Sequence, residues 1–399
     1  MRIDAHVHYI PPELADELEA FVAQEPYWVL MLTSSSAGRR IQGWATAERM
    51  IEDMDRAGLD RVMLLGEYRQ QHAGCVARND QALAIVRRWP ERVIGFAVLQ
   101  PKAGQAALDE LARCVDGGLR GVGELGPYGQ GYRLDDPDFL RVVEACIRYD
   151  IPLCLHTNEE VGHFYAGKAV TPLREFYRLA CRYPELKLVL AHWGGGLLFY
   201  ELMPGVRRAL RNVWYDTAAS PLIYPTERIF RAALACVDHR KLLYGSDYPL
   251  RLYPRRQSGP DFRPFMSEIE SLGLDKEVYD DIMGHNAERL LSQPALRPAV
   301  TQVHDTMPSP RIPIEPFMAV SAVAQAWPQT QAIFARHGIP WEDTPVPHWE
   351  PIAQAAAARG LGPEALNQLM VALNEAIGQT PQDSMKQALT DQRPHHLRP

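Results

Sequence analysis

The sequence contains few cysteines, no excess of positive charge and no long apolar run. Its 399 residues include six cysteines with no CxxC pair, a usage typical of reduced, buried thiols rather than of disulfides or a sulfur-ligated zinc. The net charge of -7 predicts no surface for nucleic acid or for an anionic membrane. No apolar run approaches the roughly 20 residues that a membrane-spanning helix needs, so we expect no membrane-spanning helix.

These absences restrict where the protein is expected to act and what it is expected to bind. Candidate functional residues begin at His6, so we expect no cleaved signal peptide. The composition is that of an ordinary globular protein, and together with the missing signal and membrane segments it predicts a soluble cytoplasmic protein. The sequence leaves the oligomeric state open, including a homo-oligomer.

Histidines and an aspartate stand where short apolar runs end. The set is His6, His8, His156, His192 and Asp247. Side chains two residues apart on a strand face the same side, so His6 and His8 can bind one ion together. Imidazole and carboxylate suit zinc, and also manganese or iron. The set therefore predicts a centre for a divalent metal, most simply zinc, with one or two ions.

Strand-like and helix-like stretches alternate through the first 290 residues or so. The expected strands are 2–6, 61–65, 93–98, 119–124, 151–156, 187–192, 212–216 and 241–246. The expected helices are 45–57, 79–89, 104–116, 138–149, 172–183, 226–237 and 264–272, with Thr46 and Asn79 as N-caps and Gly58 as a left-handed stop. Alternation predicts an α/β fold with a parallel sheet, either an open doubly wound sheet or a closed (β/α)8 TIM barrel. The ligand positions favour the barrel, because only closure brings strands one and eight together.

The sequence pattern changes after residue 293. Prolines punctuate 294–316, which predicts a linker; 317–378 reads as a small all-helical domain and 379–399 as a polar tail. We therefore expect a barrel over 1–293 followed by these three segments.

The strand-end residues carry a family resemblance over residues 1–293. The HxH pair, the single histidines at strands five and six, and the aspartate at strand eight resemble the amidohydrolase superfamily, in the branch that holds TatD-like hydrolases and small decarboxylases. The segments HWGGG from His192 and GSDYP from Gly245 add to it. The resemblance implies that His6, His8 and Asp247 hold one metal, and that His156 and His192 hold a second if one is present.

Glu124 is a sixth candidate ligand, in the segment GVGELG. In barrels of this superfamily a strand-four glutamate can ligate or bridge two metals, and members that decarboxylate aromatic acids tend to lack it. The same letters spell GxGxxG, but a dinucleotide site requires a helix directly afterwards. Pro127, Gly129 and Gly131 follow and predict a loop, so we reject the nucleotide interpretation.

The expected chemistry is attack by a metal-activated water. A metal lowers the pKa of bound water to about 7, and Asp247 can carry the proton, with His192 orienting the substrate. Loop residues beyond the ligand-bearing strands are substrate-binding candidates: Asn158, His163, Tyr224 and Arg251. Asp216, which ends strand seven, is expected to be structural.

Three functions remain open at this point. A hydrolase of an amide, lactone or ester is the main prediction, because Glu124 favours hydrolysis. A nonoxidative decarboxylase of a small unsaturated or aromatic acid is the alternative. A catalytically inactive barrel with an interaction domain is the third, and the intact ligand set argues against it. The helical domain is faintly similar to one in iron–sulfur cluster repair proteins but lacks the cysteine pair expected after Gly338-Ile339, which predicts a packing or interaction role.

Overall fold

The computed structural model describes residues 1–16, 39–162 and 171–293, a few residues between these ranges, and parts of 314–377. The few residues are 25, 27, 28, 32, 35, 36 and 168. The chain divides into two compact units, Met1–Ala299 and Val300–Pro399. No helix in the described part of the chain is long and apolar enough to cross a membrane.

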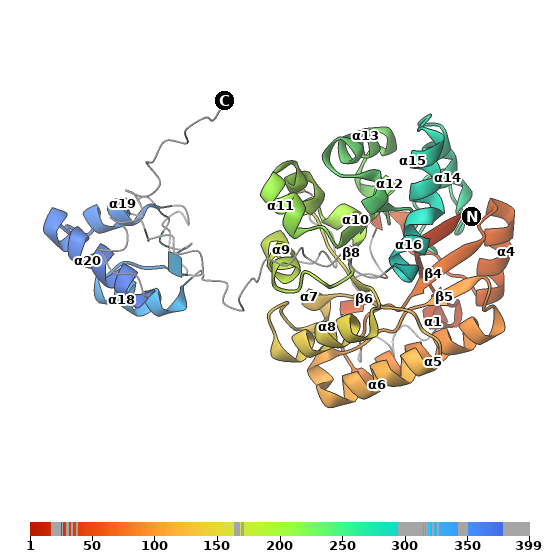
Figure 1. Cartoon of the computed structure of the whole chain (residues 1–399), viewed down its shortest axis with the longest axis horizontal. Coiled ribbons are helices and arrows are strands. Elements are labelled where there is room, and N and C mark those ends of the chain that lie inside the picture. The colour runs from red at the N-terminus through yellow and green to blue at the C-terminus, as the bar shows by residue number, and fades with distance from the viewer. Residues whose placement is uncertain are drawn as a thin grey trace, which may run out of the picture. The chain divides into compact units, whose positions relative to one another are not determined.

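Eight parallel strands form a closed barrel in the first unit (Figure 1). They are β1 (Ile3–His8), β4 (Arg61–Leu65), β5 (Val93–Gly95), β6 (Val122–Leu125), β7 (Leu153–Leu155), β8 (Leu188–Leu190), β9 (Val213–Asp216) and β10 (Leu242–Leu243). The order β1-β4-β5 and the order β10-β9-β8-β7-β6 are joined by parallel bridges, Val7 to Tyr248 and Ala97 to Val122. The predicted TIM barrel is confirmed.

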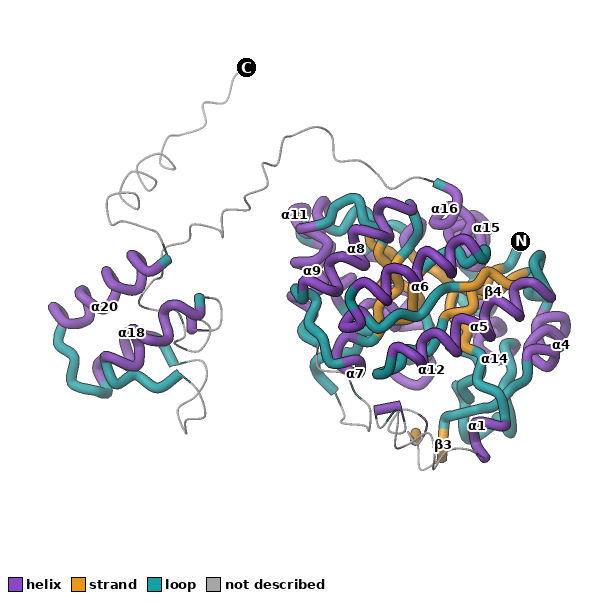
Figure 2. The backbone as a smooth tube through the Cα atoms, turned by 90° about the horizontal axis from the view of Figure 1, so that it is seen from below, coloured by secondary structure: helices purple, strands orange, loops and turns teal. Residues whose placement is uncertain are grey.

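Helices cover the outside of the barrel (Figure 2). The longer ones are α4 (Ala47–Ala57), α5 (His72–Arg88), α6 (Gln105–Asp116), α8 (Pro137–Tyr149), α9 (Leu173–Arg182), α13 (Thr226–Cys236), α14 (Arg263–Glu270) and α16 (Asn286–Ser292). Thr46 caps α4 by accepting from the Arg49 N–H, and Gly58 ends it at φ 67°. The prediction that Asn79 starts a helix is wrong. Asn79 lies inside α5, buried, where its side chain bonds both backbone groups of Val98, so a tertiary contact rather than a cap explains it.

Short elements fill the loops. They are α1 (Glu13–Asp16), a hairpin of β2 (Ser35–Ser36) and β3 (Arg39–Arg40), η1 (Pro101–Ala103), α7 (Pro127–Gln130), α10 (Ala191–Gly194), η2 (Leu197–Leu202), α11 (Pro204–Ala209), α12 (Ser220–Ile223), η3 (His239–Lys241), α15 (Lys276–Asp280) and η4 (Asp281–His285). The loop predicted after Glu124 contains the four-residue α7, because Pro127 fixes the φ of a first helical turn.

The second unit has its own hydrophobic core. Its helices are η5 (Pro328–Thr330), α18 (Gln331–Arg336), α19 (Ile352–Ala357) and α20 (Pro363–Ala376). Phe334, Ile352 and Leu373 are fully buried among them, and Trp327 and Trp341 pack against this core. The predicted linker lies mostly outside the described residues, and the predicted tail lies wholly outside them.

We predict that a chain ending at residue 299 folds and keeps its metal. The core residues of the barrel all precede residue 291, and those of the second unit all follow residue 313. Thermal melting by circular dichroism and metal analysis of the truncated protein should match those of the full chain. A shortened chain that aggregates or loses its metal would contradict this separation.

Candidate metal centre

Six potential metal ligands meet at the carboxyl ends of the barrel strands. His6 and His8 belong to β1 and Glu124 to β6, whereas His156, His192 and Asp247 directly or closely follow β7, β8 and β10. Each is less than 9% exposed. Charged groups this deeply buried are stable only beside opposite charges or a metal ion. The distances between the six side chains therefore show how the cluster is held.

One group of donors surrounds the β1 histidines. The Nε2 atoms of His6 and His8 are 3.1 Å apart. Asp247 Oδ1 lies 3.4 Å from the His8 Nε2 and 3.8 Å from the His6 Nε2. Glu124 Oε2 lies 3.7 and 3.8 Å from the same two nitrogens. Four donors thus face one point.

A second group lies on the other side of Glu124. Its Oε1 atom is 2.8 Å from His156 Nδ1 and 3.4 Å from His192 Nε2. These two nitrogens are 3.2 Å apart. Glu124 therefore turns one carboxylate oxygen to each pair of histidines, which is the arrangement of a bridging ligand.

These separations fit a metal ion. Zinc bonds of about 2.0–2.1 Å in a tetrahedral site place neighbouring donor atoms about 3.3–3.4 Å apart. The donor separations given above run from 2.8 to 3.8 Å, and the ligand atoms of the sets His6–His8–Glu124, His6–His192–Asp247 and Glu124–His156–His192 each fall within 4.8 Å of one another. The residues present can hold one ion between the β1 histidines and Asp247, and a second between His156 and His192.

The backbone is constrained where two of these ligands leave their strands. His192 has φ 57° and Asp247 has φ 66°, a left-handed conformation that non-glycine residues rarely adopt. The His192 N–H donates to Asp216 Oδ1 at 2.9 Å, and its Nδ1 contacts the Ala218 carbonyl at 3.0 Å. Strain of this kind persists only where surrounding contacts fix it, and it concentrates at functional sites.

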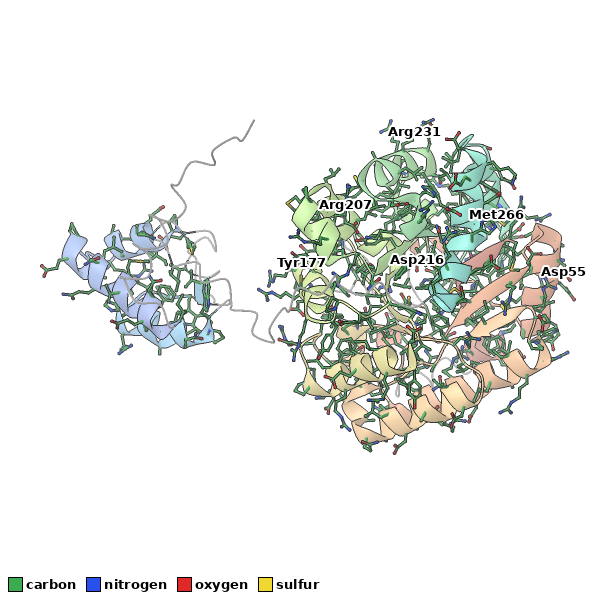
Figure 3. All side chains as sticks on the ribbon, viewed as in Figure 1. Asp55, Tyr177, Arg207, Asp216, Arg231 and Met266 are labelled. Atoms are coloured by element: carbon green, nitrogen blue, oxygen red, sulfur yellow. The ribbon has the colours of Figure 1, made fainter. Side chains whose placement is uncertain are left out.

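Asp216 links several parts of the centre. Figure 3 shows it in the middle of the barrel unit, whereas Asp55 lies on the rim. Its Oδ2 atom is 2.8 Å from His6 Nδ1, and its Oδ1 atom accepts from the N–H groups of His192 and Ala218. A carboxylate behind a ligating imidazole fixes the ring and its tautomer. The sequence suggested only a structural role, and the structure adds contact with a candidate ligand.

We predict that Asp216→Asn weakens metal binding about 10- to 100-fold, the usual cost of losing a partner behind a metal ligand. Competition with a chelating dye measures this directly. The matched control is Asp55→Asn, since Asp55 pairs with Arg92 on the surface. Equal metal affinity in the two variants would contradict the positioning of His6 by Asp216.

The electrostatics of the centre couple metal binding to protons. Burial disfavours a charged His6, but the neighbouring carboxylates, chiefly Asp216 and Glu124, outweigh this and raise its pKa to about 10. Burial likewise opposes protonation of His192, and Glu124 and Asp247 raise its pKa to about 9. At neutral pH the metal-free centre therefore holds protons that an incoming metal must displace.

We predict that metal affinity rises with pH between about pH 6 and about pH 8, because ligating imidazoles must be neutral. Both raised pKa values lie above this window, so lowering the pH favours the protonated, metal-free form. Titration with zinc in weak buffer should release up to two protons for these two rings. An affinity independent of pH would contradict the pairing of these rings with carboxylates.

The four substrate-binding candidates differ in where they lie relative to the metal centre. Asn158 lies in the centre, with Oδ1 3.1 Å from His156 Nε2. Tyr224 is partly buried beside Glu159. Arg251 donates from both its side chain and its N–H to the backbone of residues 40 and 41, which gives it a role in holding that segment. His163 lies outside the described residues.

A second group of metal-ligand types lies at the opposite end of the barrel. It consists of His239, Glu277 and Asp281. Asp281 already accepts from Arg289 at 2.8 Å and lies 3.0 Å from His239 Nε2, and Glu277 pairs with Arg240 at 3.7 Å. Ion pairs account for this group, so the carboxyl-end cluster remains the candidate site.

Comparisons with known proteins concern the barrel unit. The amidohydrolase family profile matches residues 3–293. A 2-amino-3-carboxymuconate-6-semialdehyde decarboxylase of Dictyostelium discoideum is 25% identical over 341 residues, covering 70% of this chain and 93% of that protein.

Solved structures show the same fold. The 5-carboxyvanillate decarboxylase LigW from Sphingomonas paucimobilis matches with TM-score 0.55 at 17% identity, covering 73% of this chain and 98% of that one. A dihydroxybenzoic acid decarboxylase from Polaromonas sp. JS666, with bound manganese and the inhibitor 2-nitroresorcinol, matches with TM-score 0.53 at 18% identity, over 73% and 96% of the two chains.

Proposed function

The chain belongs to the amidohydrolase family, and from that premise we propose that it is a metal-dependent decarboxylase of a small unsaturated or aromatic carboxylic acid. The observation that carries the metal dependence is the buried cluster of four imidazoles and two carboxylates at the carboxyl ends of the barrel strands. The Dictyostelium relative, named as a decarboxylase of an unsaturated acid, supports the choice of reaction.

The reaction balances without an oxidant. The bond between the substrate carbon and its carboxylate breaks, the electron pair stays on that carbon, carbon dioxide leaves, and a proton is added to the carbon. When bound, a divalent metal would hold the acid and stabilise the developing negative charge. An unsaturated or aromatic framework suits this step, because it can delocalise the electron pair.

We assign the residues of the centre to two tasks. His6, His8 and Asp247 would hold one ion, and Glu124, His156 and His192 a second or the substrate itself. Zinc fits this set of donors, and manganese or iron fits it as well. Asp247 and His192 are the groups placed to carry the proton to the substrate carbon.

Hydrolysis is the second candidate, and Glu124 is the observation that favours it. If Glu124 held two ions together with the histidines, those ions would supply an activated water suited to attack on an amide, lactone or ester. The decarboxylation proposal ranks first because of the Dictyostelium relative. An inactive barrel has little support, since all six donors converge.

A substrate panel tests the two candidates. Purified protein, stripped and reloaded with zinc or manganese, should release carbon dioxide from one of a set of conjugated and hydroxylated aromatic acids that includes 2,6-dihydroxybenzoate. The stripped protein is the control. Turnover of lactones, esters or amides with no release of carbon dioxide would overturn decarboxylation in favour of hydrolysis.

A further inference from the structure

Tyr68 stands beside the metal centre without having been a candidate from the sequence. It follows β4 by three residues, and its ring centroid is 5.9 Å from that of His156. Its phenol end packs against Gly126, two residues after Glu124, where an added Cβ would lie 2.6 Å from Tyr68 Cζ. The ring thus lies against one candidate ligand, His156, and against the segment that follows another, Glu124.

The position of the ring is fixed from several sides. Trp28 stacks on it with centroids 5.4 Å apart and planes 10° apart, and the Arg69 guanidinium lies 5.1 Å from the Trp28 ring. A Cβ at Gly129 would also come within 2.8 Å of the Tyr68 ring. Two glycines therefore leave the space that this tyrosine occupies, and the stacked indole keeps it there.

The hydroxyl of Tyr68 is buried but not satisfied. The residue is 2% exposed, and no hydrogen bond of ordinary geometry to its Oη is found in the described part of the chain, although the Tyr27 phenol lies near enough to interact with it. Tyr27 is a polar neighbour, and the carboxylates of Glu124 and Asp247 are close enough to act on the hydroxyl electrostatically. A buried polar group without a partner is costly, so such a group beside a reaction centre calls for an explanation.

An unsatisfied hydroxyl alone would not indicate function, because Tyr132 has one as well. Tyr132 is also buried and stacked, on Phe139 with centroids 5.1 Å apart. The groups that act on it are Cys75 and Asp136, neither of which belongs to the metal centre. What separates Tyr68 is its place against His156 and Gly126.

We propose that the Tyr68 hydroxyl binds the substrate, donating a hydrogen bond to a carboxylate oxygen of the acid held at the metal centre. This rests on the proposed decarboxylation. The rigid ring, held by Trp28, presents the donor in one position. A neutral hydroxyl selects an oxygen acceptor without adding a charge to a site that already holds several.

Tyr68→Phe tests the proposal, with Tyr132→Phe as the matched control. Both variants remove a buried, unpaired hydroxyl, but only the first lies at the site. For the acid of the panel that the wild type turns over fastest, Tyr68→Phe should lower kcat/KM about 10- to 100-fold, as loss of a hydrogen bond to a charged group does. Its metal content should equal that of the wild type, and its Tm should be unchanged or higher. Tyr132→Phe should keep wild-type kinetics.

Three outcomes would overturn the proposal. Unchanged kinetics in Tyr68→Phe with an active wild type would remove Tyr68 from the site and leave the proposed decarboxylation standing. A lower Tm with unchanged kinetics would make the hydroxyl a structural partner of Tyr27. A wild type that releases no carbon dioxide, and that shows no heat of binding with 2,6-dihydroxybenzoate, would overturn both the decarboxylation and this role.

Discussion

Replacing Asp247 with asparagine should lower kcat/KM by about a thousandfold or more, since the change removes an anionic ligand and a carrier of protons together. Asp247 Oδ1 lies 3.4 Å from His8 Nε2, and the left-handed backbone at this residue sets its direction. Asparagine keeps the shape but neither the charge nor the ability to accept a proton. Steady-state turnover and metal analysis of the same preparation measure the two losses separately.

Asp55→Asn is the control for Asp247→Asn, because it makes the same chemical change on the surface of α4. That variant should match the wild type in both measurements. If Asp247→Asn retained the metal and more than about a tenth of the activity, Asp247 would be neither a metal ligand nor a proton carrier. Both roles proposed for Asp247 would then be wrong.

The barrel was predictable from local patterns together with one long-range argument. Each strand is a short buried run, and most of the longer intervening helices show a 3.6-residue hydrophobic period, so local sequence is enough to place most of these elements. Closure is a long-range property. It was inferred because His6 and Asp247 needed a common metal, and the structure pairs Val7 with Tyr248 at that seam.

Parts of the site were not predictable because the contacts that define them join residues far apart in the sequence. Asp216 ends a strand like many other acidic residues, and only the fold brings it to His6 and to the backbone of His192. Tyr68 was missed because its environment includes Trp28, about 40 positions earlier in the chain. Its place three residues after a strand of the ligand-bearing barrel was the available signal.

Local chemistry also misled where a tertiary contact outweighed it. Asn79 has the residue type of an N-cap, yet it lies inside α5 because its amide satisfies Val98 and Glu110. A buried backbone group at a strand end needs a partner more than a helix needs a particular cap. The same principle explains why Asp216 serves the loop that carries His192.

Glu124→Gln should lower both the number of bound metal ions and the turnover, the latter about a hundredfold or more, if this carboxylate bridges two ions. One oxygen of Glu124 lies 2.8 Å from His156 Nδ1, and the other lies 3.7 Å from His8 Nε2. Glutamine keeps one of these acceptors, replaces the other with an N–H donor, and removes the charge. The half of the site with His156 and His192 should therefore lose its ion first.

The matched control is Glu175→Gln, because Glu175 is also buried but pairs with Arg133 away from the centre. Metal analysis after dialysis, with turnover measured on the same samples, distinguishes the possibilities. One ion in Glu124→Gln against two in the wild type would support the bridge. Full metal content and full activity would make Glu124 structural, and would remove the observation that keeps hydrolysis as a second candidate.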